Sequence, residues 1–175
     1  MTQTIIHTTK KLEKLVKKLI TTQQNSSSGK LGKWNATAFY ADRKKCWLLT
    51  NSPTKYNLVL ADIKASDLKN IESIFKNALY SQWVYDGIIT DFEHLDATIG
   101  QLIFLPTDND RITTGFQNHR LQDLEAWKYQ FGSLENMPIK ELTHRMNTSL
   151  IHIGKGHKRS DYTSATSEMK KMLGM

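Results

Sequence analysis

The chain has 175 residues, of which 39% are hydrophobic, and its 24 lysines and arginines against 17 aspartates and glutamates give a net charge of +7. This composition supports a hydrophobic core and excludes an extended disordered polymer. The single cysteine, Cys46, excludes an internal disulfide framework and any site built from several thiolates. Neither a secretory pattern nor an apolar run of about 18 residues occurs, so the sequence predicts a cytoplasmic protein without a membrane span.

The charge is spread unevenly along the chain. Residues 1–55 carry eleven basic and two acidic side chains, residues 56–110 carry three and nine, and residues 111–175 carry ten and six. A molecule with this distribution can dock a polyanion on one face, or pair its oppositely charged parts in a homo-oligomer or a complex with another protein.

The first predicted elements are a short strand and a basic helix. Ile5 and Ile6 favour a strand, and apolar residues at i, i+3, i+4 and i+7 from Leu12 favour an amphipathic helix with lysines on its remaining surface. We therefore interpret residues 1–22 as a basic amphipathic helix with its lead-in. The polar residues 23–32 are expected to form a loop.

Three strands are predicted next, at residues 34–41, 46–50 and 56–60. The segments between them contain Asp, Asn, Ser and Pro, which favour turns. Because such short connections cannot make the crossover that parallel pairing needs, they predict an antiparallel meander.

Helices dominate the rest of the chain. Ser66 is a good N-cap for one of them, and Thr114 with Gln117 has capping-box spacing for another. The predicted elements are a helix over 66–86, an irregular acidic segment at 88–100, a strand at 101–105, and helices at 114–131, 136–147 and 164–173. This order predicts a single α+β domain over residues 1–175, with a central antiparallel β-meander flanked by helices. Residues 33–162 would form its core and residues 163–175 a C-terminal helix.

Several short motifs resemble a family of uncharacterised bacterial domains. They are Trp34-Asn35, the Asp-Arg-Lys-Lys-Cys hairpin at 42–46, and an Asn-x-Arg…Gly-x-x-Asn pattern formed by Asn109, Arg111, Gly115 and Asn118. The resemblance spans roughly residues 32–162, although Asp110 stands where the family pattern has Asn and a proline is missing near Ser149. It implies the fold class and a bacterial cytoplasmic setting, but no activity, substrate or cofactor.

The predicted hairpin turn concentrates cations beside aromatic residues. The cations are Arg43, Lys44 and Lys45, and the aromatic residues are Trp34, Tyr40 and Trp47. Cations that follow phosphates and rings that stack on bases are what a single-stranded nucleic acid requires. The alternative interpretation is that the rings face the core and the turn is merely solvated.

Two further basic segments suit phosphate contacts. Lys14, Lys17 and Lys18 would lie along a phosphate backbone, form an ordinary solvated face, or touch an acidic membrane surface. In the loop 154–159, Lys155, Lys158 and Arg159 offer a phosphate-binding loop, with a plain surface loop as the alternative. The spacing of a nucleotide-binding P-loop is absent, so the sequence does not indicate NTP hydrolysis.

Arg111, Asn118 and His119 are the candidate residues for an enzyme site. An arginine near a helix start can bind an anion, and a histidine can transfer protons near neutral pH. The alternative role is structural, with Arg111 and Asn118 holding a loop to the meander. The histidines show no metal-ligand spacing, and we expect neither a metal nor another cofactor.

Three functions are compatible with these features. The leading hypothesis is a non-enzymatic, nucleic-acid-associated accessory protein that binds DNA or RNA. The first alternative is a protein-interaction module, such as the partner-neutralising component of a two-gene system, in which the acidic segment 86–96 and the basic helix are docking surfaces. The second is a small enzyme that acts on an anionic substrate near Arg111.

Overall fold

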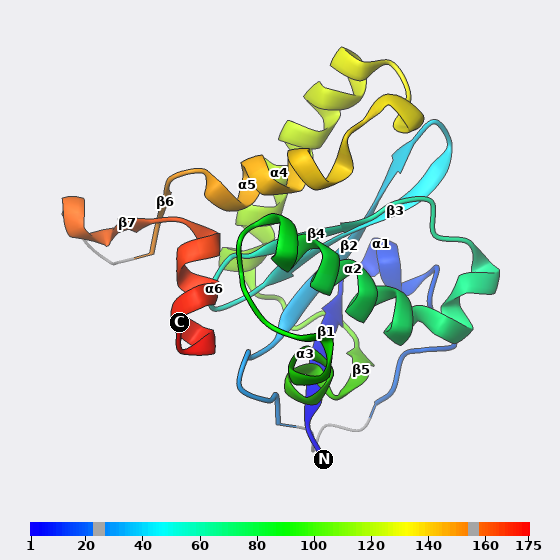
Figure 1. The fold of residues 1–175 in the computed structure, drawn as a ribbon. Helices are drawn as coiled ribbons and strands as arrows, with labels where there is room; N and C mark the ends of the chain where they lie inside the picture. Colours follow the sequence, from blue (N-terminus) through cyan, green and yellow to red (C-terminus); the bar gives the residue numbers. More distant parts are fainter. Residues whose placement is uncertain (23–26, 154–157) are drawn as a thin grey trace.

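A five-stranded mixed sheet forms the centre of the fold (Figure 1). The computed structural model describes residues 1–22, 27–153 and 158–175. The strands lie in the order β4-β3-β2-β1-β5. Their bounds are β1 (Gln3–Thr8), β2 (Trp34–Ala41), β3 (Lys44–Asn51), β4 (Asn57–Leu60) and β5 (Gln101–Leu105).

The predicted meander is present in β2, β3 and β4, which pair antiparallel in sequence order. The turn between β2 and β3 is tighter than predicted, because only Asp42 and Arg43 lie outside the strands, both with positive φ. That geometry is typical of a two-residue hairpin turn. Lys44 and Lys45 therefore belong to β3, where neighbouring side chains point to opposite faces of the sheet.

The sheet as a whole is not antiparallel, which corrects the prediction of a purely antiparallel centre. β1 lies between β2 and β5 and is parallel to both. Parallel pairing needs a long connection, and the segment between β1 and β2 supplies one. Thr4, Ile5 and Ile6 are all buried, because an interior strand is covered on both faces.

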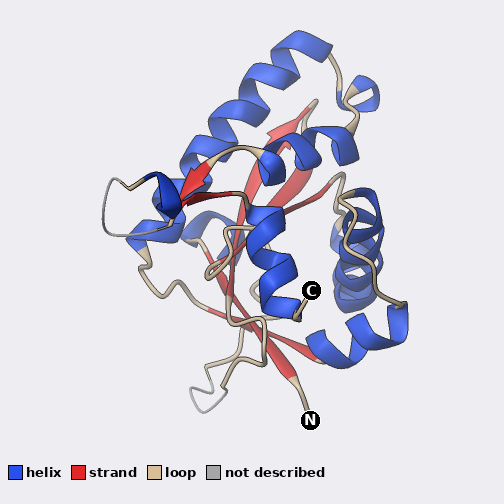
Figure 2. Cartoon of the chain, turned by 60° about the vertical axis from the view of Figure 1, so that its left-hand side comes forward, coloured by secondary structure: helices blue, strands red, loops and turns tan. Residues whose placement is uncertain are grey.

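Helices cover both faces of the sheet, as Figures 1 and 2 show. The helical elements are α1 (Lys10–Glu13), η1 (Ala65–Asn70), α2 (Ile71–Tyr85), α3 (Phe92–Ile99), α4 (Arg111–Phe131), η2 (Leu134–Asn136), α5 (Ile139–Thr148), η3 (Arg159–Asp161) and α6 (Ala165–Leu173). A separate two-stranded ribbon pairs β6 (Ile151–His152) with β7 (Tyr162–Thr163). None of the helices in the described ranges combines the length and apolar composition needed to cross a bilayer.

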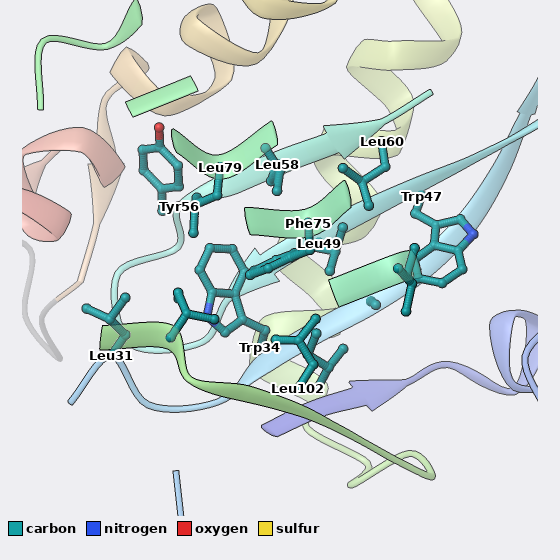
Figure 3. Packing of buried hydrophobic residues seen from close by; sticks show 14 of the residues in the cluster. Leu31, Trp34, Trp47, Leu49, Tyr56, Leu58, Leu60, Phe75, Leu79 and Leu102 are labelled. Atoms are coloured by element: carbon teal, nitrogen blue, oxygen red, sulfur yellow. The ribbon is translucent and has the colours of Figure 1, made fainter. Parts of the chain in front are cut away.

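The two faces of the sheet have separate hydrophobic cores. On one face, Trp34 and Trp47 pack in a cluster that includes Phe75 and Leu79 of α2 (Figure 3). The rings of Trp34 and Phe75 meet edge to face, with centroids 5.5 Å apart. The opposite face forms a second cluster under α4 and α5. Its buried members are Phe39, Ala41, Cys46, Leu48, Val59, Leu124, Leu134, Met137, Leu142 and Met146.

The predicted basic helix within residues 1–22 is wrong beyond its first turn. α1 ends at Glu13, and the chain continues through turns in which Leu15 and Leu19 donate to carbonyls three residues earlier. Consecutive turns can bury Leu12 and Val16 as a helix would, so the apolar spacing did not distinguish them. At Thr21 the backbone N–H donates to the carbonyl of Phe104, so this segment lies along the free edge of β5.

Three other predictions change in detail. Residues 92–99 of the acidic segment form a helix, α3, because the Asp91 side chain caps its first turn. α4 begins at Arg111 instead of Thr114, because its N-cap is Asp110. In the predicted loop 23–32, Leu31 is buried in the core, while residues 23–26 lie outside the described ranges.

Candidate functional site

A pocket lies at the carboxyl ends of two adjacent parallel strands, β1 and β5. After β1 the chain turns to the face of the sheet that carries α2, where Leu12 and Val16 join the core. After β5 it turns to the opposite face, where Leu124 of α4 joins the second cluster. Neighbouring parallel strands whose following segments leave on opposite faces create a crevice at their carboxyl ends, which is where ligands bind in α/β sheets.

The pocket has a volume of about 490 Å³. The end of β1, the loop between β5 and α4, and the first two turns of α4 form its walls. The lining residues are Thr9, Lys10, Thr107, Asn109, Arg111, Thr114, Gly115 and Asn118. Two of these side chains are cationic, five carry a hydroxyl or an amide, and none is a carboxylate, so the lining as a whole favours an anion.

The segment 107–111 keeps its two acidic residues out of the pocket lining. Thr107, Asn109 and Arg111 line the pocket, whereas Asp108 and Asp110, which alternate with them, do not. Both carboxylates pair instead with Lys33, whose Nζ atom lies 3.2 Å from Asp110 Oδ2 and also contacts Asp108. The two acidic side chains that alternate with the lining residues are therefore paired with a lysine outside the pocket.

Polar contacts hold these two carboxylates in place. Asp108 accepts a hydrogen bond from Asn35 Nδ2 at 3.1 Å, and Asp110 accepts one from Ser52 Oγ at 3.1 Å. Burial alone would raise the pKa of both carboxyl groups, but the hydrogen bonds outweigh it and lower the pKa of Asp108 and, more strongly, that of Asp110. The donors are Lys33 and the Asp110 backbone for Asp108, and Thr113 and Lys33 for Asp110. Both groups are therefore ionised at neutral pH.

The four residues of the Asn-x-Arg…Gly-x-x-Asn pattern all line this pocket. Arg111 and Asn118 are seven residues apart, which places them two turns apart on one face of α4. Gly115 lies between them, and a side chain there would meet no other atom within 4 Å. Of the three candidate enzyme residues, the structure thus brings Arg111 and Asn118 together but leaves His119 out of the lining.

A second feature is a group of exposed lysines that we call the lysine surface. Its members are Lys11, Lys14, Lys17, Lys18, Lys45, Lys64 and Lys69. Lys45 and Lys64 line one small depression together with Leu15 and Val16, and Lys18 and Lys69 line another. These lysines come from three separate segments of the chain. Among the described residues, none of them forms an ion pair with a carboxylate.

One exposed aromatic ring lies beside the lysine surface. Tyr40 is 39% exposed, stands opposite Lys45 in the sheet, and has the Nζ atom of Lys11 5.3 Å from its ring centroid. Trp34 and Trp47, by contrast, are buried in the core and cannot stack on a ligand. Of the three aromatic residues that the sequence suggested for stacking on bases, only Tyr40 is exposed enough to do so.

The remaining predicted phosphate-binding residues lie elsewhere. Lys44 is 3.4 Å from Glu135, on the side of the sheet opposite to Lys45, and Arg43 lies in the turn itself. Lys158 and Arg159 are exposed, but they lie near η3 and β7, at the opposite side of the molecule from α1 (Figure 1). Lys155 lies outside the described residues.

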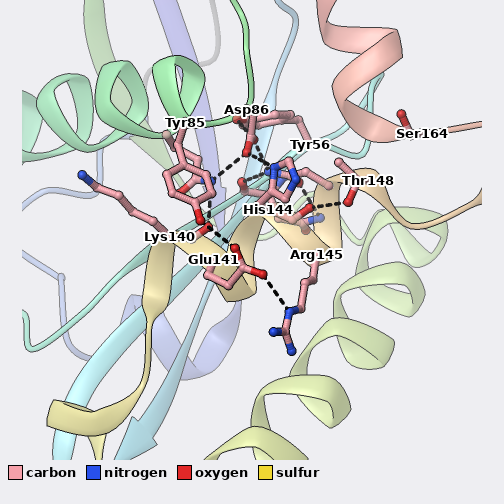
Figure 4. Close-up of polar contacts among 12 residues, drawn as sticks. Tyr56, Tyr85, Asp86, Lys140, Glu141, His144, Arg145, Thr148 and Ser164 are labelled. Atoms are coloured by element: carbon pink, nitrogen blue, oxygen red, sulfur yellow. Dashed lines mark hydrogen bonds and ion pairs between the residues drawn. The ribbon is translucent and has the colours of Figure 1, made fainter.

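Sequence reasoning missed a buried polar cluster centred on Asp86, at the end of α2 (Figure 4). The carboxyl group of Asp86 is fully enclosed and accepts four hydrogen bonds. The donors are Gln82 Nε2 at 3.0 Å, Asn147 Nδ2 at 3.2 Å, His144 Nδ1 at 2.8 Å and the hydroxyl of Tyr56. Because a carboxylate only accepts, Nδ1 of His144 is the donor in this contact.

The surface above this cluster carries more polar side chains. The Tyr85 hydroxyl donates to Glu141 Oε2 at 2.6 Å, Arg145 Nε donates to Glu141 Oε1 at 3.1 Å, and the Tyr85 ring meets the His144 ring edge to face. Burial and the adjacent charge of Asp86 raise the pKa of Tyr56 well above its usual value, so this hydroxyl remains a donor. The cluster connects β4, α2 and α5.

The acidic segment 86–96 uses most of its carboxylates within the chain. Asp86 is buried, Asp91 accepts from the backbone N–H of His94 at 2.6 Å, and Asp96 Oδ1 lies 2.7 Å from Lys76 Nζ. This internal use leaves little of the acidic docking surface that the sequence suggested.

The described residues contain no group of three or more histidine, cysteine or acidic side chains that could hold a metal ion. Cys46 is buried in the hydrophobic cluster under α4 and α5, and burial raises the pKa of its thiol. Its environment is that of a small core residue.

The fold and the pocket define an α+β domain with a polar site at the carboxyl ends of two parallel strands. A family model described as a domain of unknown function, DUF6933, matches residues 5–168. The chain belongs to this family, which confirms the expectation of an uncharacterised domain family. No curated protein and no solved structure matches the chain significantly.

Proposed function

We propose that the protein is a bacterial, cytoplasmic, nucleic-acid-associated accessory protein that binds a single strand along the lysine surface. The observation that carries this proposal is that lysines from three distant segments, around residues 11–18, 45 and 64–69, lie on one surface. Among the described residues, these lysines form no ion pairs with carboxylates. Each phosphate that these lysines neutralise releases condensed counterions, which favours binding.

Tyr40 supports a single-stranded ligand over a duplex. Its partly exposed ring lies beside Lys11 and Lys45, so a base can stack on the ring while its flanking phosphates meet the lysines. In a duplex the bases are already stacked on one another and offer no free face to a protein ring. The protein-docking alternative is less well supported, because Asp86, Asp91 and Asp96 have partners within the chain.

Fluorescence anisotropy with labelled single-stranded DNA and RNA of about 20 nucleotides tests this proposal. We expect binding at low salt that weakens as salt rises, with a log–log slope of about −0.7 for each phosphate contacted. The triple variant Lys14→Ala/Lys17→Ala/Lys18→Ala should lower affinity at least tenfold.

The matched control is Lys140→Ala/Lys158→Ala/Lys171→Ala, which removes the same charge from three exposed lysines away from the lysine surface. We expect the control to reduce affinity no more than about twofold, through the weaker overall field. Equal losses in the two triple variants would show attraction by net charge alone and would overturn the proposed surface. An absence of binding to both DNA and RNA at low salt would overturn the function.

A further inference from the structure

We propose that the pocket between β1, β5 and α4 binds a phosphomonoester, namely the terminal phosphate of a strand that lies on the lysine surface. This inference rests on the proposed function and assigns a separate role to the pocket. Its ligand would be the end of the strand, whereas the lysine surface would contact phosphates along the strand.

The charge around the pocket favours a dianion. Lys10 and Arg111 line it, no carboxylate does, and Asp108 and Asp110, which alternate with lining residues in sequence, pair with Lys33. A phosphomonoester carries a charge of about −1.5 to −2 at neutral pH, compared with one negative charge for each phosphodiester. The pocket should therefore discriminate a terminal phosphate from an internal one on electrostatic grounds.

The donors in the lining match the three free oxygens of a phosphomonoester. The guanidinium group of Arg111 can donate two parallel hydrogen bonds, and the Lys10 ammonium group adds a compact charge. The hydroxyls of Thr107 and Thr114 and the amides of Asn109 and Asn118 can donate to the remaining positions, whereas the Thr9 hydroxyl already donates to Thr37. Such a mixture is typical of sites that hold phosphate without a metal ion.

The dimensions of the pocket also suit the end of a strand. A volume of about 490 Å³ accommodates a phosphate with its attached sugar. Gly115 leaves the wall formed by α4 open, because a side chain there would project into free space.

The pocket and the lysine surface have members that are neighbours in the sequence. Lys10 lines the pocket, and Lys11, the next residue, lies over the ring of Tyr40 beside Lys45. A strand anchored in the pocket by its terminal phosphate would therefore need to extend only past Lys10 to reach Lys11 and Tyr40.

The test compares oligonucleotides of one sequence that carry a 5′-phosphate, a 3′-phosphate or hydroxyls at both ends, measured by anisotropy at fixed salt. We expect one phosphorylated end to bind at least tenfold more tightly than the hydroxyl form. Arg111→Ala should abolish this preference and leave the affinity for the hydroxyl form within twofold. Arg145→Ala, which removes the same charge from α5, should preserve the preference.

Each result has a defined meaning. Equal affinity for all three oligonucleotides would overturn this inference and leave the proposed function standing, whereas no binding of any of them would overturn the proposed function itself. Calorimetric titration with AMP and with inorganic phosphate separates the two sources of a phosphomonoester. If AMP binds as tightly as the phosphorylated strand, and Arg111→Ala abolishes that binding, the ligand is a free nucleotide and the assignment to a strand end is wrong.

Discussion

His144 Nδ1 lies 2.8 Å from Asp86 Oδ1, although the two residues are 58 positions apart in the sequence. Asp86 ends α2 and is fully enclosed, while the side chain of His144 on α5 is 35% exposed. The contact therefore joins a buried carboxyl group to a side chain that reaches solvent. Asp86 should contribute more to stability than His144. The buried donors that bond to Asp86 cannot form replacement hydrogen bonds with water if the carboxyl group is removed.

We expect Asp86→Ala to lower the free energy of unfolding by about 3 kcal/mol or more. The substitution leaves the Tyr56 hydroxyl, Gln82 and Asn147 without their buried acceptor, and each such loss costs roughly 1–3 kcal/mol. His144→Ala should cost only about 1 kcal/mol, because water can replace the imidazole at the surface. Urea unfolding followed by tryptophan fluorescence measures both, and similar losses in the two variants would contradict the central role of Asp86.

Acid should destabilise the protein through the contacts of Lys33. The pKa of Asp110 is lower in the folded chain than in the unfolded chain, and so is that of Asp108. Their contribution to stability is therefore complete above the unfolded pKa, about 4, and is lost as the pH falls from there toward the folded values. Asp110→Asn keeps an N-cap for α4 but removes the charge. We expect it to cost roughly 1 kcal/mol at pH 7 and to flatten the decline in the urea midpoint between pH 5 and pH 3. A decline as steep as that of the unmodified protein would show that other carboxyl groups dominate.

Substitution by alanine should raise the stability of the protein at one glycine and lower it at another. Gly115 lies inside α4 with free space around it, so Gly115→Ala should stabilise the protein by up to about 1 kcal/mol while weakening binding in the pocket. Gly100 has a φ of +62°, and a Cβ atom there would lie 1.9 Å from the Thr2 carbonyl oxygen. Gly100→Ala should therefore lower the melting temperature by several degrees, by roughly 4 °C or more. Calorimetric melting measures both effects, and destabilisation by Gly115→Ala would contradict the open space described beside α4.

Cys46 should not react with a thiol reagent in the native protein. Its side chain is buried, and burial raises the pKa of the thiol, so little thiolate is present and the reagent cannot reach it. With Ellman's reagent we expect labelling only at the rate at which the protein opens, rising with urea. Immediate labelling in buffer would show that β3 separates from α4 and α5 under native conditions.

The meander could be predicted because its signals are local. Alternating apolar residues in 34–41 and turn residues at Asp42 and Pro53 specify strands and their connections within a few positions of each other. The position of β1 could not be predicted in this way, since its partners lie at Trp34 and Gln101, far along the chain. The helix expected after Leu12 is wrong because a series of turns buries the same residues.

In the candidate site, too, the features set by nearby residues could be predicted and those set by distant residues could not. The spacing of Arg111 and Asn118 is enough to place them on one helix face, and both line the pocket. Asp108 and Asp110 pair with Lys33 and do not line the pocket. Because Lys33 is more than 70 residues away in the sequence, no local pattern could reveal this pairing. The cluster around Asp86 was missed for the same reason, since its partners Tyr56 and His144 share no spacing motif with it.

The interior position of β1 has a consequence for synthesis on the ribosome. Its neighbours β2 and β5 emerge later, and the pairing with β5 waits until Leu105 has left the exit tunnel. Until then a nascent chain presents an apolar strand with an open edge, the kind of segment that aggregates or recruits chaperones. Slow translation before β5 would prolong that exposure, so the yield of folded protein should depend on elongation speed across the codons of α2 and α3.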